Sequence, residues 1–242
     1  MLPSKLEAAS AAASVMGLLR SPATARIVPF ALYIVLLALA PLVQKMLPGW
    51  DSRWFYAVQI GAVMTALAVF SRSYVELFAG VAVRVRDWAL AAGVGIAVFI
   101  AWINLDLPWA TLGETLGETQ GFEPTHADGT LDWTLIAVRI FGAAAVVPIM
   151  EELFWRSFIL RWIDRSDFLQ LAPVMVSLRA LVISSLLFGV EHDLWFAGLL
   201  AGLAYGWLYM RSGSLWPPIA AHAVTNLLLG LWVVQTGSWQ FW

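Results

Sequence analysis

The chain alternates between long apolar runs and short polar connections, and this pattern predicts helices that cross a membrane. A helix needs about 20 apolar residues to span the hydrocarbon core of a bilayer, and most of the runs approach that length. The predicted segments cover residues 27–47, 54–71, 88–105, 132–163, 180–192, 194–210 and 215–234. We therefore expect an all-α fold, a polytopic transmembrane helix bundle with about seven membrane segments.

The fourth apolar segment is the longest. A helix from Asp132 to Ile163 would measure roughly 45 Å, which is more than one bilayer crossing requires. We expect it to tilt, to kink at Pro148 or to project into the cytoplasm. The connection after it, from Ser166 to Arg179, is interrupted by a proline and is expected to lie obliquely or at the interface before a fifth helix that ends near residue 192.

Small residues mark one stripe of the sixth segment. Gly198, Gly202 and Gly206 recur every four residues, so they lie on one helix face. Glycines at this spacing let a neighbouring helix approach closely in a membrane. We interpret the stripe as a packing seam, which would hold the nearby His192 still.

Composition supports the membrane interpretation and limits the chemistry. The 242 residues are 61% hydrophobic and 12% charged, whereas soluble domains carry about 25% charged residues. The chain has no cysteine, which excludes disulfides, thiol nucleophiles and cysteine-based metal sites. A net charge of −2, without a basic stripe or a phosphate-binding glycine loop, gives no sign of a nucleic-acid partner.

Basic residues are distributed unequally between the two sides of the predicted bundle. The connection from Asp106 to Asp132 is acidic and contains no Lys or Arg, so we place it outside. The side with most basic residues is then cytoplasmic and includes the amino terminus. Its residues are Lys5, Arg20, Arg26, Arg72, Arg84, Arg86, Arg161, Arg165 and Arg211, against Lys45 and Arg53 on the other side.

Residues 148–156, Pro-Ile-Met-Glu-Glu-Leu-Phe-Trp-Arg, place charged groups inside an apolar run. Ionisable groups at this depth are costly, and the default interpretation is functional. On a helix, Glu152 and Arg156 are four residues apart and face each other, whereas Glu151 points about 100° away. We expect Glu152 to pair with Arg156 and Glu151 to be free for a different task.

Two further patterns could share this site. Phe188 and His192 are four residues apart, as are His222 and Asn226, so each pair is expected on one helix face. Counted from the nearest cytoplasmic arginines, Glu151, His192 and His222 all lie about 15 to 20 Å deep. They could therefore meet at one level inside the bilayer.

A glutamate, two histidines and an amide in a protected cavity suit hydrolysis of an amide bond. A carboxylate or imidazole can take a proton from water, and imidazole or amide donors can stabilise the oxyanion. The same Glu151, His192 and His222 could instead hold Zn²⁺. No His-Glu-x-x-His signature is present, so we expect no metal cofactor.

Structural interpretations of these residues stay open. The Glu152–Arg156 pair could serve packing alone, His192 could be a solvent-facing loop residue, and His222 could bond Asn226 between helices. His126 and Arg139 have no partner that the sequence suggests, and we interpret them as structural. The first lies in the acidic connection and the second near the outer face.

In order along the chain, the three patterns resemble the CPBP family, the CAAX-protease and bacteriocin-processing (Abi-type) membrane proteins. The family pattern of Glu-Glu-x-x-x-Arg, Phe-x-x-x-His and His-x-x-x-Asn is met at Glu151–Arg156, Phe188–His192 and His222–Asn226. The segment around Glu151 is similar to bacterial CAAX prenyl protease-related proteins. The motifs span about 80 residues, which leaves roughly the first 130 uncovered.

The resemblance implies a glutamate-type intramembrane endopeptidase that acts on a membrane-associated peptide or protein, in some relatives a prenylated one. It implies that Glu151 and His192 activate water, that His222 and Asn226 form the oxyanion side, and that Glu152 and Arg156 support them. A non-enzymatic membrane scaffold or immunity-type binding protein is the alternative. A transporter or proton relay is a third, which the lack of an evident inverted repeat disfavours.

These predictions divide the chain into three parts. Residues 1–26 are a cytoplasmic leader, residues 27–130 form the amino-terminal helices and the acidic outer loop, and residues 131–242 form the CPBP-like helical core. We expect an integral protein of the bacterial inner (plasma) membrane, with the lipid bilayer and a membrane-bound substrate as partners and with no nucleic acid.

Overall fold

A computed structural model describes residues 21–78, 83–112 and 122–242 and confirms the all-α prediction for these ranges. Two π-helical turns, Gly142–Val146 and Leu153–Ile159, lie within one continuous helix, Trp133–Trp162. The helices are α2 (Pro22–Met46), α3 (Phe55–Val69), α4 (Val75–Phe78), α5 (Val85–Asn104), α7 (Trp133–Phe141), α8 (Val147–Glu152), α9 (Leu160–Trp162), α10 (Leu178–Val190), α11 (Trp195–Ser212) and α12 (Trp216–Thr236).

Four helices in the described ranges are long and apolar enough to cross a membrane. They are α2, α5, the continuous helix α7–α9 and α12. The other predicted spans correspond to α3, α10 and α11, of which α3 has 15 residues and α10 has 13. A polytopic helical membrane protein is therefore confirmed, with some segments shorter than a full crossing.

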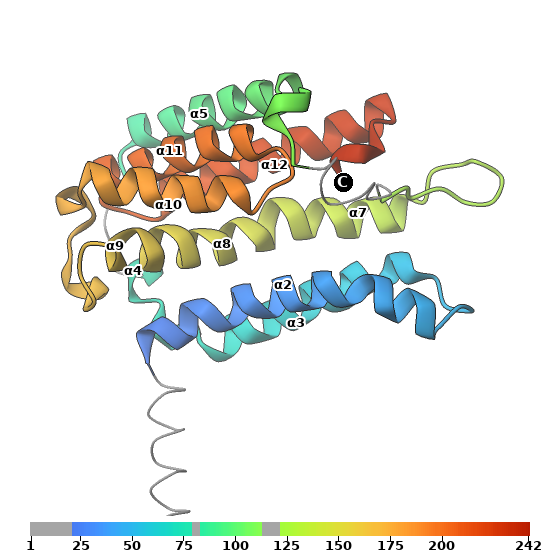
Figure 1. Cartoon of the computed structure of the whole chain (residues 1–242), viewed down its shortest axis with the longest axis horizontal. Helices are drawn as coiled ribbons and strands as arrows, with labels where there is room; N and C mark the ends of the chain where they lie inside the picture. Colours follow the sequence, from blue (N-terminus) through green and yellow to red (C-terminus); the bar gives the residue numbers. More distant parts are fainter. Residues whose placement is uncertain (1–20, 79–82, 113–121) are drawn as a thin grey trace, which may run out of the picture.

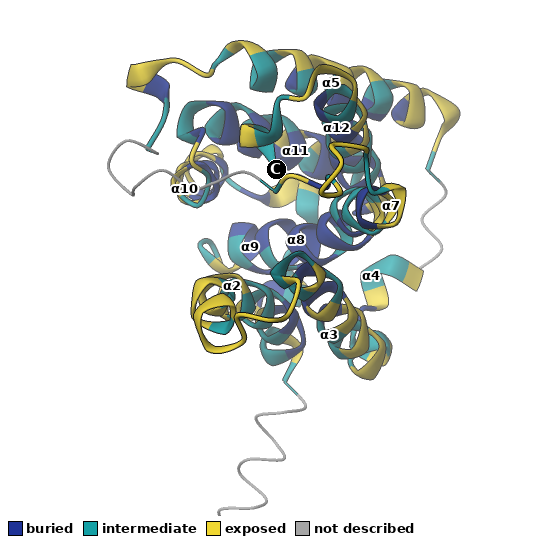
Figure 2. Cartoon of the chain, turned by 90° about the vertical axis from the view of Figure 1, so that its right-hand side faces the viewer, coloured by how far each residue is buried: buried dark blue, intermediate teal, exposed yellow. Residues whose placement is uncertain are grey.

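The continuous helix α7–α9 runs through the middle of the bundle (Figure 1). The antiparallel pair α2 and α3 packs on one side of it, and α5, α10, α11 and α12 lie on the other. As expected for a central helix, most residues of α8 and α9 are buried, whereas the outer faces of α2 and α3 are exposed (Figure 2). Exposed apolar side chains such as Val35, Leu37 and Leu42 suit contact with lipid.

The first helix begins five residues earlier than the sequence predicted. Ser21 caps it, since its Oγ accepts the amide of Thr24 at 3.0 Å, and Pro22 occupies the first helical position. Arg26 is consequently a helical residue in the protein interior rather than part of a leader. The rest of the predicted leader, residues 1–20, lies outside the described residues.

The glycine stripe of α11 packs against α10, as the spacing predicts. A Cβ on Gly198 would lie 3.1 Å from the Cα of Gly189, and one on Gly202 would lie 2.8 Å from the Cα of Ser185. The two backbones approach so closely that larger residues would force them apart. The same contact reaches His192, whose Cβ would be 3.4 Å from a Cβ on Gly198.

The two long predicted connections contain short turns in their described parts. Between Ser166 and Arg179 the chain forms the short 3₁₀ turns Phe168–Gln170 and Pro173–Met175 before α10 begins. The acidic connection is described at its two ends, where Pro108–Ala110 forms a further turn. Glu114 and Glu118, which contribute to its predicted charge, lie outside the described residues.

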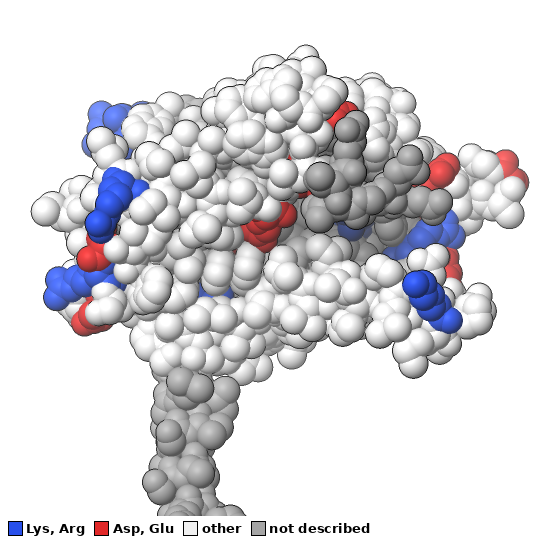
Figure 3. Space-filling view, viewed as in Figure 1, with Lys and Arg blue, Asp and Glu red and all other residues white. Residues whose placement is uncertain are grey.

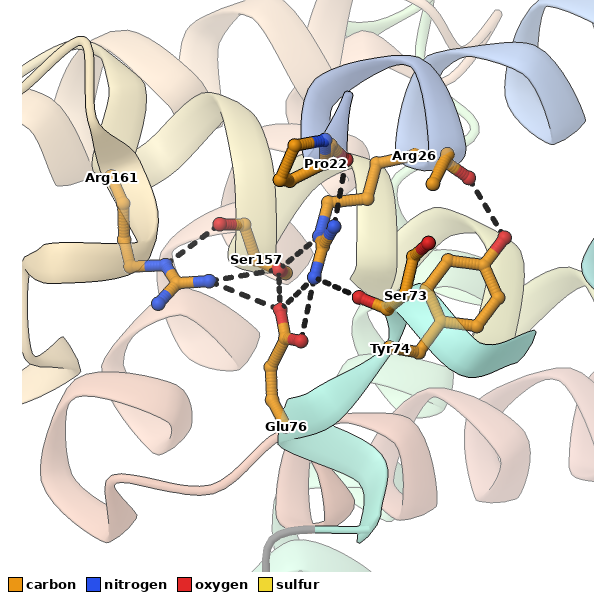
Figure 4. A network of polar contacts seen from close by, with 8 residues as sticks. Pro22, Arg26, Ser73, Tyr74, Glu76, Ser157 and Arg161 are labelled. Atoms are coloured by element: carbon orange, nitrogen blue, oxygen red, sulfur yellow. Dashed lines mark hydrogen bonds and ion pairs between the residues drawn. The ribbon is translucent and has the colours of Figure 1, made fainter. Parts of the chain in front are cut away.

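A buried ionic cluster ties α2 and α4 to the end of the central helix (Figure 4). We call Arg26, Glu76, Ser157 and Arg161 the Glu76 cluster. Arg26 Nη2 lies 2.5 Å from Glu76 Oε1, Arg161 Nη2 lies 3.1 Å from the same oxygen, and Ser157 hydrogen-bonds it as well. Arg26 Nε also donates to Ser157 Oγ at 2.7 Å. The carboxylate of α4 thereby fixes two other segments, α2 and the end of the central helix.

The surroundings of Glu76 favour its ionised form. Burial raises the pKa of this carboxyl, but the charge of Arg26 and the hydrogen bonds from Ser157 and Arg26 outweigh burial, so its pKa lies below the ordinary value. The carboxylate is therefore charged at neutral pH, and it partly neutralises two buried guanidinium groups.

Charged residues gather at the two ends of the molecule. On the face shown in Figure 3, Lys and Arg gather with neighbouring Asp and Glu at the end where α9 and α10 lie, and both signs also occur at the opposite end. The band between them is mostly uncharged. This distribution suits a bundle whose middle lies in hydrocarbon.

Candidate active site

The π-helical turns surround the double glutamate on the central helix. In the first turn the amide of Val147 donates to the carbonyl of Gly142, five residues back, instead of to Ala143. Pro148 follows and has no amide hydrogen to offer. The predicted disturbance at Pro148 is therefore a π-helical turn on its amino-terminal side, and the helix continues through it.

Glu152 and Arg156 form the ion pair that their spacing predicts. Arg156 Nη1 donates to Glu152 Oε1 at 3.0 Å, and both side chains are buried. His222 Nδ1 lies 3.0 Å from the same oxygen. Because a carboxylate only accepts hydrogen bonds, this Nδ1 carries the proton. The contact between Glu152 and His222 was not foreseen, since the two residues are 70 positions apart.

Glu151 lines a cavity of about 210 Å³. His192, His222 and Asn226 line the same cavity, together with aromatic residues from α2, α3, α5 and α11. Glu151 Oε2 lies 4.0 Å from His222 Nε2, which is too long for a hydrogen bond. The structure thus brings four of the six candidate residues to one space, while Glu152 and Arg156 lie behind His222.

The imidazole of His222 is held from several directions. The Tyr205 ring stacks on it, with centroids 5.1 Å apart and an interplanar angle of 21°. The Tyr205 hydroxyl donates to Thr225 Oγ1 at 2.7 Å, and Thr225 in turn bonds the carbonyl of Gly95 at 2.8 Å. A Cβ on Gly95 would lie 2.5 Å from the carbonyl of Ala221, so glycine allows α5 and α12 to meet beside His222.

His192 lies in the turn after α10 rather than on the helix. The prediction that it shares a helix with Phe188 is wrong, because α10 ends at Val190. Contact with Phe188 is nevertheless kept, since His192 Nδ1 lies 2.8 Å from the Phe188 carbonyl. A carbonyl accepts, so Nδ1 carries the proton and Nε2 is free to accept one. The Trp102 ring packs edge-on against the imidazole at 5.3 Å.

Asn226 does not bond His222 but reaches the central helix. Its Nδ2 donates to the carbonyl of Ala143 at 2.8 Å. That carbonyl has no donor in its own helix, because the amide of Val147 bonds Gly142 and Pro148 has none. The π-helical turn and the proline therefore leave an acceptor that fixes the Asn226 amide, whose second N–H is available at the cavity.

Three buried polar atoms at this site have no hydrogen-bond partner among the described residues. They are Glu151 Oε2, Glu152 Oε2 and Arg156 Nη2. Buried polar atoms are nearly always paired, so unsatisfied ones mark places where water or a ligand binds. We call Glu151, Glu152, Arg156 and His222 the Glu151 cluster.

The Zn²⁺ alternative requires three protein ligands around one point. In the described part of the chain, no three His, Asp or Glu residues converge as metal ligands. His222 Nδ1 is directed at Glu152, and His192 Nδ1 is directed at a backbone carbonyl. Each imidazole therefore keeps only its Nε2 for a further ligand, and we derive no chemical step through Zn²⁺.

Sequence reasoning missed several neighbours of the site. Trp155 Nε1 donates to Glu191 Oε2 at 2.9 Å, which links the central helix to the turn that carries His192. Arg139 lines the cavity, although the sequence suggested only a structural role. Neither contact has a local spacing signal, because each depends on how distant helices pack.

The fold and the cavity define an integral membrane helix bundle with a buried carboxylate–imidazole site. Residues 133–228 match a family model described as type II CAAX prenyl endopeptidase Rce1-like, and all six candidate residues fall inside the match. The resemblance predicted from the three motifs is confirmed over this part of the chain. No curated protein matches the chain, and neither does any solved structure.

Proposed function

We propose that this protein is an intramembrane endopeptidase that hydrolyses a peptide bond of a membrane-associated substrate. The observation that carries the proposal is that Glu151, His192, His222 and Asn226 line one cavity. The Rce1-like match supports a hydrolase of the CAAX protease type. A prenylated or an exported peptide is the substrate class that we favour.

In the proposed reaction, Glu151 and His192 activate water. Water loses a proton to Glu151 or to His192 Nε2 while its oxygen bonds the substrate carbonyl carbon. The C–N bond then breaks, and the leaving amine takes up that proton. The supporting geometry is a Glu151 oxygen without a partner and a free His192 Nε2, because Nδ1 is held by Phe188.

His222 and Asn226 form the proposed oxyanion side. A protonated His222 would donate Nδ1–H to Glu152 and keep Nε2–H for the oxyanion. Asn226 would offer its second N–H, because the Ala143 carbonyl takes the first. Donors fixed in advance stabilise developing charge with little reorganisation. Glu152 and Arg156 act as positioning residues, since they hold His222 from behind.

Replacement of Glu151 tests this proposal. In purified protein reconstituted in phosphatidylcholine vesicles, Glu151→Gln should lower the cleavage rate by about 10²- to 10⁴-fold, the usual contribution of a general base. The substrate probe is an internally quenched S-farnesylated peptide. Glu123→Gln is the matched control, because Glu123 is exposed and outside the cavity. Unchanged turnover of the Glu151 variant would refute its role.

We further propose that the reaction needs no metal ion. Cleavage should persist after exhaustive chelation, with less than one metal ion for every ten protein molecules by elemental analysis as a rough criterion. Loss of activity on chelation and its recovery with Zn²⁺ would contradict this. If no variant or condition shows cleavage while the fold is intact, the scaffold or immunity-type alternative gains support instead.

The proposed location is the bacterial inner membrane with a cytoplasmic amino terminus. The excess of Lys and Arg in the connections predicted to be cytoplasmic supports this orientation. Labelling from one side of intact cells tests it, with single cysteines introduced near Arg53 and near Arg165 in a chain that has none of its own. A periplasmic reagent should modify only the first.

A further inference from the structure

Glu191 is an ionisable residue beside the site that the proposed reaction does not use. It follows the last residue of α10, directly precedes His192 and is not among the residues that line the cavity. Its side chain is partly buried, and its Oε2 accepts a hydrogen bond from Trp155 Nε1 at 2.9 Å. Ionisable groups inside a membrane bundle are costly and tend to be functional.

The hydrogen bond between Trp155 and Glu191 joins the two segments that carry the proposed water-activating groups. Trp155 lies four residues after Glu151 on the central helix, and Glu191 lies one residue before His192. Among the described residues, no other hydrogen bond connects the turn 191–194 to the central helix. This contact is therefore placed to set the separation between the carboxylate and the imidazole.

The indole of Trp155 is a well-held donor. The residue is 7% exposed, and its ring packs edge-on against Phe30 and Phe188, with centroids 5.8 Å apart in each pair. Phe154 packs against it as well, at 5.0 Å. Three aromatic neighbours fix the ring, so its Nε1 proton keeps one direction, and the carboxyl of Glu191 lies in that direction.

The other contacts of the turn reach α11 and the segment that follows α5. A Cβ on Gly189 would lie 2.7 Å from the carbonyl of Trp195, so glycine lets the end of α10 pack directly on the start of α11. The amide of Leu112 donates to the Asp193 carbonyl at 2.7 Å. These contacts hold the turn from one side, and the bond to the indole fixes its distance from the central helix.

We infer that Trp155 and Glu191 are positioning residues, and that their hydrogen bond sets the distance between the two groups that activate water. The inference rests on the proposed function and adds to it a pair of residues outside the cavity. Removal of either partner should lower kcat, because the carboxylate and the imidazole no longer meet the same water molecule. KM should be nearly unchanged, because no contact with the substrate is lost.

A double-mutant cycle in the vesicle assay with the farnesylated peptide tests this inference. Trp155→Phe removes the indole N–H and keeps an aromatic ring, and Glu191→Leu removes the acceptor and keeps a similar size. Each should lower kcat per folded molecule by about 10- to 100-fold, with KM within about twofold, and the double variant should lose no more than either single one. Unchanged kcat, or losses that multiply in the double variant, would overturn the inference.

The conservative variant Glu191→Gln separates positioning from proton transfer. Its amide oxygen can still accept from Trp155, so the rate should stay within about threefold of the wild type. A contact that serves only positioning is rescued in this way. A proton carrier would lose activity equally in Glu191→Gln and Glu191→Leu, and that result would overturn the inference.

Two variants beside the same turn serve as matched controls. Trp195→Phe removes an indole N–H that bonds the Trp109 carbonyl at 3.3 Å, and Asp193→Asn alters an exposed side chain of the turn. Both should retain the wild-type kcat. Equal losses in the controls and in the test variants would assign the effect to general loosening of the turn and would overturn the inference.

A measurement without substrate separates this inference from the proposed function. The chain has three histidines, so selective isotope labelling of histidine gives three imidazole signals by NMR in detergent. Trp155→Phe and Glu191→Leu should shift the signal of His192, which is assigned by its absence in His192→Gln, and should leave that of His126 unchanged. If the signal shifts but no cleavage occurs even in the wild type, the proposed function fails and the positioning contact stands. If the wild type cleaves and neither kcat nor the signal depends on the pair, the inference alone fails.

Discussion

The two buried ionic clusters on the central helix differ in how completely their polar atoms are paired. In the Glu76 cluster, no buried side-chain atom lacks a hydrogen-bond partner. In the Glu151 cluster, one turn away, Glu151, Glu152 and Arg156 each leave one atom without a partner. Both clusters combine arginine with glutamate and both are buried, so composition alone does not distinguish them.

The difference indicates separate roles. A fully paired cluster holds segments together, and here it fixes α2 and α4 to the end of the central helix. An incompletely paired cluster keeps donors and acceptors available for water or substrate beside a cavity. We therefore expect mutations in the first cluster to affect stability and mutations in the second to affect turnover.

Removal of the shared carboxylate should give the largest effect on stability. Glu76→Ala leaves Arg26 and Arg161 buried without their anion, and breaking a buried pair in this way costs about 3–5 kcal/mol. Thermal unfolding in detergent should show the loss, whereas cleavage per folded molecule should stay near that of the wild type. A stable variant with reduced turnover would remove the contrast between the clusters.

Replacement of Glu152 should affect both stability and turnover. Glu152→Gln removes the charge between Arg156 and His222 and should cost about 1.5–3 kcal/mol, the range for hydrogen bonds to charged groups. The rate should also fall, because His222 loses the acceptor that fixes its Nδ1 proton. Unfolding and cleavage measured on one preparation check both parts. A loss of stability with normal turnover would assign Glu152 to packing alone.

A smaller effect is expected from Pro148→Ala. Alanine at position 148 restores a backbone N–H. This new donor can bond the Ala143 carbonyl and so competes with the Asn226 amide for it. Cleavage should fall by about three- to tenfold, which corresponds to the roughly 0.5–1.5 kcal/mol of one hydrogen bond. Stability should be equal or higher, because proline is unfavourable inside a helix. Reduced stability with unchanged cleavage would contradict the proposed positioning of Asn226.

The smallest effect is a pH dependence of stability from Glu76. Its pKa is lower in the folded protein than the ordinary value of 4.5. Its contribution is therefore complete above about pH 4.5 and is lost as the pH falls through the lowered folded pKa. Thermal unfolding between pH 7 and pH 3 should show a steeper acid loss for the wild type than for Glu76→Gln. Parallel curves would argue against an ionised Glu76.

Local spacing predicted the parts of the site that lie on one helix. The Glu152–Arg156 pair and the helix from Trp133 to Trp162 follow from four-residue spacing and from an apolar run that Asp132 caps. Residue counts from the cytoplasmic arginines also predicted a common depth for Glu151, His192 and His222. In the structure these three residues line the same cavity. Their catalytic roles remain predictions.

Contacts between distant segments could not be predicted in this way. Arg26 pairs with Glu76 across 50 residues and His222 with Glu152 across 70. The fifth helix was predicted to end near residue 192, whereas α10 ends at Val190, so His192 lies in the turn that leads to α11. Residue spacing predicts which side chains are neighbours within one helix. Contacts between different helices depend on tertiary packing.

The most direct test of the separation between the clusters is cleavage per folded molecule, measured side by side for Glu151→Gln and Glu76→Gln. We predict that Glu151→Gln unfolds at the wild-type temperature and cleaves at least about 10²-fold more slowly. We predict that Glu76→Gln unfolds at a lower temperature and cleaves at the wild-type rate per folded molecule. Equal loss of turnover in both variants, or normal turnover in Glu151→Gln, would contradict this account.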